Sequence, residues 1–346
     1  MRRYRRTLAA AALMATLVSG TAGWAAGSGQ SPVTGPPPGT AAWLDDTSLG
    51  RALPDPEKTA PAQVAAFFRT LSPAQRHALT ARHPSVVGNL DGAPVELRYR
   101  ANELAVAKDP RYARLAESRR QILAFDPRGR GTVAEVYGNL LTARHVAVVV
   151  PGSDIDARTY DRPGDPYGTP AGMATALRTA TNGRTAVVAW AGYTTPLGVG
   201  LDAATGGLAE AGADRLARFT GGLTAAGVRT PKLFCHSYGS VVCGLAARDA
   251  AASDIVVLGS PGMRAANVAA LRTDARVWAA KDPSDWISKV PNVEFLGLGH
   301  GRDPAEKGFG ARRVPARTAH GHTGYFAPGT DSLRAFAAIA TGGDVR

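Results

Sequence analysis

The fold is decided by residues 231–247, which read PKLFCHSYGSVVCGLAA. The first four residues of this stretch predict a strand, the last eight predict a helix, and Ser237 stands at the apex of the turn between them. Such a turn forces the serine into a strained backbone conformation and exposes its hydroxyl above the sheet. Small residues are needed two positions to either side, because strand and helix nearly touch there. Gly239 meets that need, whereas Cys235 stands where glycine is usual. We therefore predict a nucleophilic Ser237; the alternative is an unreactive serine at a strand-to-helix turn.

Strands and helices alternate on both sides of this turn. Short apolar runs predict strands at 121–125, 132–139, 146–150, 185–190, 232–235, 255–258 and 276–280, with helices near 171–180, 207–225, 265–271 and 331–340. The first two strands form a hairpin. Alternation of buried strands with helices predicts an α/β fold in which a mostly parallel sheet is covered by helices on both faces. Ligands of such sheets bind at the carboxyl ends of the strands, where Ser237 lies.

The start of the chain has the parts of a secretory signal. Arginines at positions 2, 3, 5 and 6 precede an apolar run at 8–18 and small residues up to Ala26, so we predict a signal peptide over 1–26 and a secreted protein. The apolar run is shorter than the roughly 20 residues that span a bilayer, which argues against a permanent membrane anchor. Residues 27–56 are rich in proline and glycine and are predicted to be a disordered leader. Residues 57–120 read as an N-terminal helical extension and 121–346 as the α/β domain.

The net charge of the chain is +12, and removal of the four signal arginines leaves +8. That charge could favour weak association with an anionic cell envelope. The arginines are scattered and no aromatic residues are interleaved with them, so nucleic-acid binding is not expected.

The chain has two cysteines, Cys235 at the end of the strand before Ser237 and Cys243 on the helix after it. A secreted protein favours their pairing, and the turn folds the two segments against each other. We expect a disulfide below the serine; the alternative is two buried thiols that act as small core residues.

A serine hydroxyl needs a base, usually a histidine. In the chain order that goes with this kind of turn, the histidine should lie in a loop ahead of the final helix. The loop at 319–325 offers His322, which we prefer, and His320 as the alternate; His300 is a more distant candidate. His236 adjoins the serine, but its side chain should leave the turn in another direction, as a packing or hydrogen-bonding residue. Two histidines alone, without a carboxylate cluster, do not predict a metal site.

The base needs an acid that holds its imidazole in the right tautomer, and this acid should follow the strand at 276–280. Asp285, which precedes Trp286 and Ile287, fits best. Asp282 is the alternate, although Asp-Pro is also a common turn.

An oxyanion that forms at the serine needs two backbone amides. One should belong to Tyr238, directly after the nucleophile. The other should come from the loop after the strand at 146–150, from Ser153 or Asp154, where Gly152 permits close approach.

Six motifs follow one another along the chain. They are Gly88-Asn89-Leu90-Asp91-Gly92-x-Pro94 with Arg98 and Asn102, Val150-Pro151-Gly152, Trp190-x-Gly192-Tyr193-x-x-Pro196, His236-Ser237-Tyr238-Gly239-Ser240, Ser260-Pro261-Gly262 and His322-x-Gly324-Tyr325. In this order they resemble a family of secreted, mainly actinobacterial α/β hydrolases. The resemblance covers about residues 60–340. It implies an α/β-hydrolase fold over 121–346 and a serine hydrolase, and it implies little about the substrate.

We therefore expect a secreted serine hydrolase that cleaves a small-molecule or lipid ester with the triad Ser237, Asp285 and His322, without a cofactor. Two alternatives remain at this point. One is a secreted peptidase or amidase with the same triad, and the other is a non-catalytic envelope-binding protein on a hydrolase scaffold.

Overall fold

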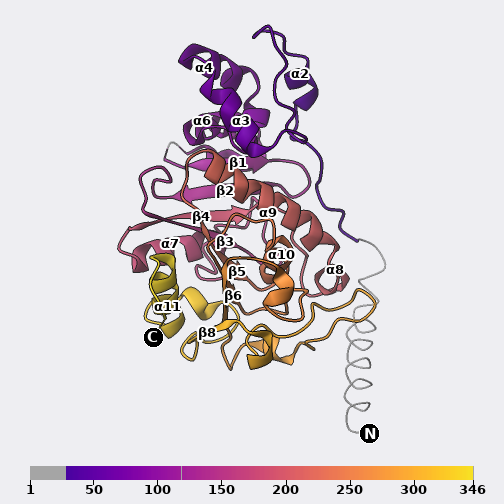
Figure 1. The fold of residues 1–346 in the computed structure, drawn as a ribbon, viewed down its shortest axis with the longest axis vertical. Coiled ribbons are helices and arrows are strands. Elements are labelled where there is room, and N and C mark those ends of the chain that lie inside the picture. The colour runs from indigo at the N-terminus through magenta and orange to yellow at the C-terminus, as the bar shows by residue number, and fades with distance from the viewer. Residues whose placement is uncertain (1–28, 118, 346) are drawn as a thin grey trace.

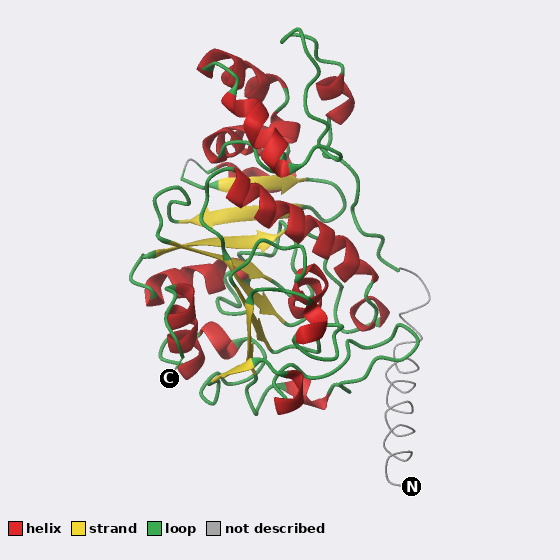
Figure 2. Ribbon diagram, viewed as in Figure 1, coloured by secondary structure: helices red, strands yellow, loops and turns green. Residues whose placement is uncertain are grey.

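An eight-stranded sheet forms the centre of the molecule (Figures 1 and 2). The computed structural model describes residues 29–117 and 119–345, so the predicted signal peptide over 1–26 lies outside the described residues. The strands are β1 (Ile122–Asp126), β2 (Thr132–Tyr137), β3 (His145–Val150), β4 (Thr185–Ala191), β5 (Lys232–His236), β6 (Asp254–Leu258), β7 (Arg276–Ala280) and β8 (Arg312–Val314). Their order is β1-β2-β4-β3-β5-β6-β7-β8. The hairpin β1–β2 and the pair β2–β4 are antiparallel, and all other neighbours are parallel.

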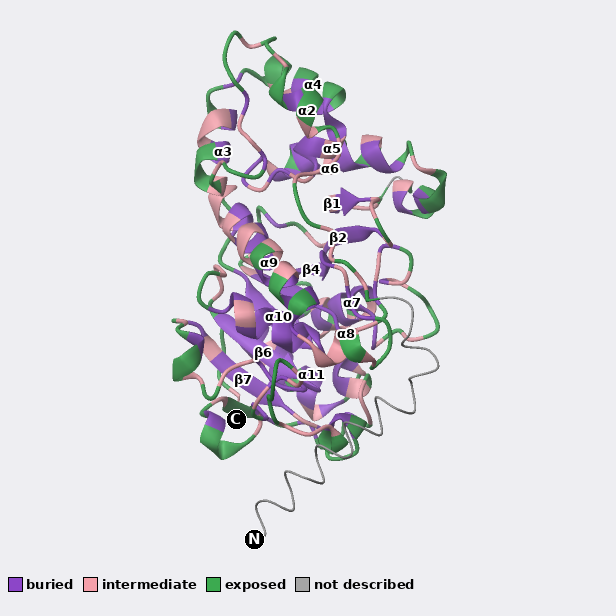
Figure 3. Cartoon of the chain, turned by 90° about the vertical axis from the view of Figure 1, so that its right-hand side faces the viewer, coloured by how far each residue is buried: buried purple, intermediate pink, exposed green. Residues whose placement is uncertain are grey.

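Helices cover both faces of this sheet, as predicted. The helices α7 (Pro170–Ala180) and α11 (Asp331–Ala340) pack on one face, and α9 (Gly207–Ala225) and α10 (Gly239–Ala246) pack on the other. Strand β3 shows why a parallel strand reads as a continuous apolar run. Val146, Val148 and Val150 join the core beneath α9 and α10, while Ala147 and Val149 join the core beneath α7 and α11. Buried residues accordingly fill the strands (Figure 3).

The N-terminal part forms a third, smaller core above the β1 edge of the sheet (Figure 1). Its helices are α2 (Thr40–Leu44), α3 (Pro61–Arg69), α4 (Pro73–Arg82), α5 (Pro84–Val87) and α6 (Val95–Val106). Ser72 caps α4 by accepting a hydrogen bond from the Gln75 amide, with proline at the first helical position.

The first of the six motifs joins this helical part to the sheet. The buried guanidinium of Arg98 on α6 donates to the carbonyls of Gly88 and Leu123, and the Asn102 amide donates to those of Gly88 and Ile122. A Cβ on Gly88 would lie 2.2 Å from the Asn102 side chain, so glycine is required there. These contacts satisfy backbone groups along β1, the edge strand, which would otherwise stay open for pairing. The motif is therefore structural.

The structure differs from the predicted disordered leader over 27–56. Residues 29–56 include α2 and lie against the body of the protein, because Trp43 is fully buried and donates from its indole nitrogen to the Pro54 carbonyl at 2.7 Å. The amides of Gln30 and Val33 donate to Asp202 and Thr194. The composition of a segment predicts only whether that segment can form a hydrophobic core by itself. Residues 29–56 are instead ordered by packing against the rest of the chain.

Two further differences concern short elements. The helix expected at 265–271 is only a 3-10 turn, Ala269–Leu271. Strand β8 was not predicted, because its three residues include two exposed arginines and give no alternating pattern. The remaining short elements are α8 (Leu201–Ala204) and the 3-10 helices at Pro110–Ala116, Trp286–Lys289, Lys307–Phe309 and Gly324–Phe326.

Candidate active site

Ser237 lies at a sharp turn between the end of β5 and the start of α10. Its φ is 54°, a left-handed conformation that non-glycine residues rarely adopt, and its amide donates to the Leu258 carbonyl at 3.0 Å. A Cβ on Gly239 would lie 2.5 Å from the Val150 carbonyl oxygen, so α10 can begin this close to β3 only with glycine there. The side chain of Ser237 is partly exposed. The strained, solvent-facing serine that the sequence predicted is present.

The predicted disulfide between Cys235 and Cys243 is also present. Both residues are fully buried, and their Cα atoms lie 6.4 Å apart. The departure from glycine at position 235 is thereby explained, since the Cys235 side chain occupies the space between β5 and α10 as one half of a covalent link. The turn at Ser237 keeps its left-handed conformation with cysteine at this position.

His322 lies between Ser237 and Asp285. Its Nε2 is 2.9 Å from the Ser237 hydroxyl, and its Nδ1 is 2.9 and 3.1 Å from the two carboxylate oxygens of Asp285. A carboxylate only accepts hydrogen bonds, so Nδ1 carries the proton and Nε2 presents its lone pair to the serine hydroxyl. The serine, the imidazole and the carboxylate thus form one continuous chain of hydrogen bonds from the surface to a buried acid.

Asp285 stays charged in a buried place. Burial opposes its ionisation, but the hydrogen bond from His322, the Ile287 amide at 2.9 Å and the Tyr325 hydroxyl at 2.7 Å together lower the pKa of this carboxyl. The ordinary value is 3.8. An ionised Asp285 can orient the imidazole and stabilise the imidazolium that forms when His322 takes a proton.

Asp282, the alternate acid, lies nearby and has a different role. It accepts from the amides of Ser284 and Gly321, at 2.6 and 3.1 Å, and so ties the loop of β7 to the loop that carries His322. The Tyr325 hydroxyl links the two acids, because it accepts from the Asp282 amide at 3.0 Å and donates to Asp285. The structure therefore brings Asp285, and not Asp282, to the imidazole.

Three residues of this site carried no predicted role. Tyr325 ends the motif His322-x-Gly324-Tyr325, and its hydroxyl donates to Asp285. Gly259, at the end of β6, has φ 54°, and a Cβ there would lie 2.9 Å from the Asp285 carboxylate and 3.1 Å from His322. Trp286 packs on the imidazole with ring centroids 4.6 Å apart and is still 42% exposed. The motif His322-x-Gly324-Tyr325 was the sequence signal available for Tyr325, and the position directly after Asp285 was the signal available for Trp286.

His236 supports the imidazole from behind, in the packing and hydrogen-bonding role that the sequence favoured. Its Nε2 lies 2.7 Å from the His322 carbonyl oxygen, and the two rings are 4.7 Å apart. Burial, with a smaller contribution from the charge of His322, lowers the pKa of His236 to about 3. The ring is therefore neutral near pH 7, and its Nε2–H donates to the carbonyl.

The other candidate bases lie elsewhere. His320 is exposed, with φ 57°, next to the loop glycine that Asp282 binds. His300 is buried, packs edge-on against Tyr238 and reaches the Ala203 carbonyl at 2.7 Å; burial lowers its pKa to about 4. Neither of them contacts Ser237.

The amides that could hold an oxyanion lie on either side of the serine. A Cβ on Gly152 would be 2.6 Å from the Ser237 Cβ, so the loop after β3 lies directly against Ser237. The expectation for Asp154 is wrong, because its amide donates to the Pro196 carbonyl at 2.8 Å and its φ is 64°. Among the described residues, neither the Tyr238 nor the Ser153 amide donates to another protein group. These two amides are the remaining pair.

The aromatic residues at the end of β4 do not face the serine. Trp190 and Tyr193 are buried, stack with ring centroids 5.9 Å apart and belong to the core beneath α9. The Tyr193 hydroxyl donates to the Pro151 carbonyl at 2.8 Å and so supports the loop after β3.

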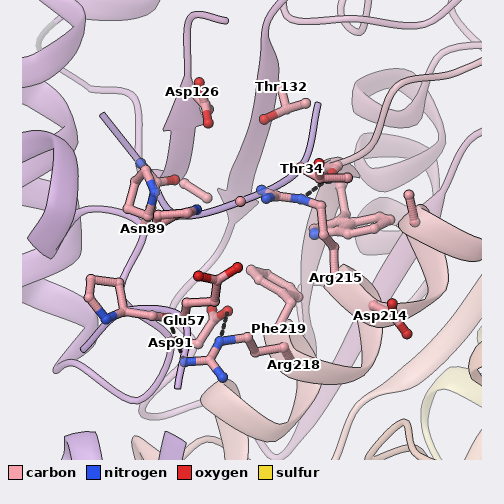
Figure 4. Close-up of a pocket in the computed structure, with 18 of the residues that line it drawn as sticks. Thr34, Glu57, Asn89, Asp91, Asp126, Thr132, Asp214, Arg215, Arg218 and Phe219 are labelled. Atoms are coloured by element: carbon pink, nitrogen blue, oxygen red, sulfur yellow. Dashed lines mark hydrogen bonds and ion pairs between the residues drawn. The ribbon is translucent and has the colours of Figure 1, made fainter. Parts of the chain in front are cut away.

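A cavity of about 430 Å³ lies away from this site, between the N-terminal segment, β1–β2 and α9. Figure 4 shows Arg215 and Arg218 reaching into it from α9. Arg215 donates to the Gly192 carbonyl at 2.7 Å, and Arg218 donates to two carbonyls of residues 56–59. Asp91, bound to Arg98, also faces this cavity. The cavity lies where the helical part meets the sheet, and its lining carries charges of both signs.

Comparison with known proteins agrees with this architecture. Residues 126–295 match a family model described as alpha/beta hydrolase. The fold is an α/β-hydrolase fold, as predicted, with a mostly parallel eight-stranded sheet between two helical layers. Helices of the described part of the chain are all too short or too polar to cross a bilayer.

The chain is also similar to two uncharacterized proteins of Mycobacterium tuberculosis, from strains CDC 1551/Oshkosh and H37Rv. Each is 29% identical over an alignment of 375 positions, which covers 84% of this chain and 57% of the relative. The chain thus matches little more than half the length of these curated relatives. Among solved structures, a predicted CIB-like hydrolase from Thermoplasma acidophilum is 13% identical, with TM-score 0.39 over 65% of this chain and 96% of that one. An α/β serine hydrolase without lid from Xanthomonas campestris is 18% identical, with TM-score 0.33 over 49% and 74%.

Proposed function

We propose that this protein is a secreted serine hydrolase that cleaves carboxylic esters. The observation that carries the proposal is the position of the His322 imidazole, 2.9 Å from the Ser237 hydroxyl on one side and 2.9 Å from the Asp285 carboxylate on the other. Secretion is supported by the buried Cys235–Cys243 disulfide, since such bonds persist mainly in oxidising compartments.

In the proposed reaction, the Ser237 oxygen attacks the ester carbonyl carbon while His322 Nε2 takes the hydroxyl proton. Asp285 stabilises the imidazolium, and the amides of Tyr238 and Ser153 donate to the oxyanion. The bond between the acyl carbon and the alcohol oxygen then breaks, and the alcohol leaves with the proton that His322 held. Water, deprotonated by the same imidazole, attacks the acyl-serine, releases the carboxylic acid and returns the proton to Ser237.

The test is labelling of the secreted protein by a fluorophosphonate probe together with hydrolysis of p-nitrophenyl esters. We expect wild type to be labelled and to turn over, and Ser237→Ala to lose both while its thermal unfolding stays within a few degrees. If the wild-type protein is neither labelled nor active on the esters, the result would favour a non-catalytic envelope-binding protein. Faster cleavage of amides than of matched esters would favour a peptidase or amidase.

A further inference from the structure

Exposed apolar side chains gather at the edge of the sheet where Ser237 lies. Nine large hydrophobic residues are exposed in the described part of the chain, and seven of them lie on two loops, at 196–201 and 286–296. The first loop follows β4 and the second follows β7. Since β4, β5 and β7 run parallel, both loops leave the same edge of the sheet as the nucleophile. Scattered single exposures need no explanation, but this clustering does.

Six of these residues form what we call the apolar rim. They are Leu197 and Val199 on the first loop, Leu201 at the start of α8 directly after it, and Val293, Phe295 and Leu296 on the second loop, with exposures from 42% for Val293 to 86% for Leu296. The segments that follow the two loops are hydrogen-bonded, because the Gly299 amide donates to the Ala204 carbonyl at 2.8 Å; in Figure 1 the orange loop lies beside α8. The two halves of the rim therefore lie on neighbouring segments.

The two loops of the rim lead to residues beside the proposed catalytic groups. The first loop binds the residue after Ser153, because the Gly198 amide donates to the Asp154 carboxylate at 2.8 Å. The second leads into His300, whose ring packs on Tyr238. Trp286, the seventh exposed hydrophobic residue, covers His322. A molecule seated on the rim would meet the nucleophile.

The tip of the second loop is built to protrude. Phe295 and Leu298 exchange both backbone hydrogen bonds, at 2.9 and 3.0 Å, and so close a two-residue hairpin turn. Leu296 occupies the first turn position with φ 50°, where asparagine or glycine is usual. Leu296 thus combines a strained backbone conformation with an apolar side chain that is exposed to water. Both features are explained if this side chain inserts into an apolar surface.

We propose that the apolar rim docks the enzyme on a lipid surface, and that the ester substrate is an acyl lipid drawn from that surface. This inference rests on the proposed ester hydrolysis at Ser237. A protein partner seated on the rim would cover the serine, whereas a lipid surface brings the ester to it. Charge favours an anionic surface, because the chain without the predicted signal carries a net charge of +8 and Lys289, beside Trp286, is exposed.

The binding test uses the Ser237→Ala background, so that partition is measured without turnover. Probe vesicles contain phosphatidylcholine with one fifth phosphatidylglycerol, and bound protein is separated by flotation. The test variant is Phe295→Ser with Leu296→Asn, because asparagine tolerates the left-handed turn. The control is Leu141→Ser, which removes a hydrophobic residue of 45% exposure at the opposite edge of the sheet. We expect the double variant to lose about a hundredfold in partition constant, since each side chain accounts for about tenfold, and the control to bind as the background does.

The turnover test restores Ser237 and compares emulsified trioleoylglycerol with soluble p-nitrophenyl acetate. The ratio of the two activities should fall about tenfold or more in the double variant and stay constant in Leu141→Ser. Three results would overturn the inference: vesicles that do not retain the Ser237→Ala protein, a double variant that binds as its background does, or a wild-type dimer that the double variant dissociates. Failure of the proposed function would give a different result. The wild-type protein would then hydrolyse neither ester, whether or not it binds the vesicles.

Discussion

The buried ring of His236 makes stability depend on pH in a way that can be calculated. In the unfolded chain its pKa is 6.5, and in the folded protein burial lowers the pKa to about 3. Between these values the unfolded state binds a proton that the folded state does not, so acid favours unfolding. The contribution of His236 is fully present above pH 6.5 and is lost as the pH falls, by about 1.4 kcal/mol for each pH unit. From neutral pH down to pH 4.5 the loss amounts to about 2.7 kcal/mol.

The perturbation is His236→Gln, which keeps an amide donor for the His322 carbonyl but cannot titrate. Urea unfolding of wild type and variant should be measured at pH 7.5, 6.5, 5.5 and 4.5. Because the buried His300 also has a depressed pKa, wild type should lose stability steeply over this range. The variant starts lower at pH 7.5 and loses about 2.7 kcal/mol less between the two ends.

The matched control is His77→Gln, on an exposed surface of α4. Its stability should follow the wild-type pH curve, because this side chain is exposed to water in the folded state as it is in the unfolded state. Parallel curves for His236→Gln and wild type, within about 0.5 kcal/mol, would refute the reasoning, since His236 would then titrate alike in both states.

Three further predictions concern the groups around the nucleophile. Asp285→Asn should lower kcat on a soluble ester on the order of a thousandfold, because the imidazole loses its tautomer, while Asp282→Asn should lower it at most about tenfold. Equal losses in steady-state assays would contradict the separation of the two acids. Tyr325→Phe removes a hydrogen bond to a buried carboxylate and should lower the free energy of unfolding by about 2 kcal/mol in urea titrations, together with a lower kcat. Replacing Cys235 and Cys243 by alanine opens a loop of eight residues and should lower the unfolding free energy by about 2.5 kcal/mol; thermal curves that match oxidised wild type would contradict this.

Buried strands and long amphipathic helices could be predicted from the sequence because their patterns are local. Helix α9 and strand β7 have the predicted bounds, and the hairpin β1–β2 forms around the predicted turn. Strand β8 and the turn at Ala269–Leu271 could not be predicted, since three-residue elements are fixed by the neighbours they pair with. The placement of residues 29–56 depends on contacts with Thr194 and Asp202, more than 150 positions away.

The same distinction between local patterns and distant contacts applies to the site. Chain order was enough to select the loops that carry the acid and the base, because the topology of the sheet fixes which loops meet at the serine. It could not decide between Ser153 and Asp154, because that choice depends on the Pro196 carbonyl, which a distant loop supplies. Nor could it show that Gly259 must lack a side chain, since the clash involves Asp285 and His322 across two loops.

Cys235 shows how a local rule and a tertiary contact combine. Glycine is usual at this position because strand and helix nearly touch, and a larger side chain alone would push them apart. In this chain the side chain is bonded to Cys243 on the opposing helix, so the contact between strand and helix becomes covalent. The constraint acts on both segments that define the backbone of Ser237, which holds φ 54° between them. Strain at a nucleophile persists only where the surrounding structure fixes it, and here a disulfide contributes to that constraint.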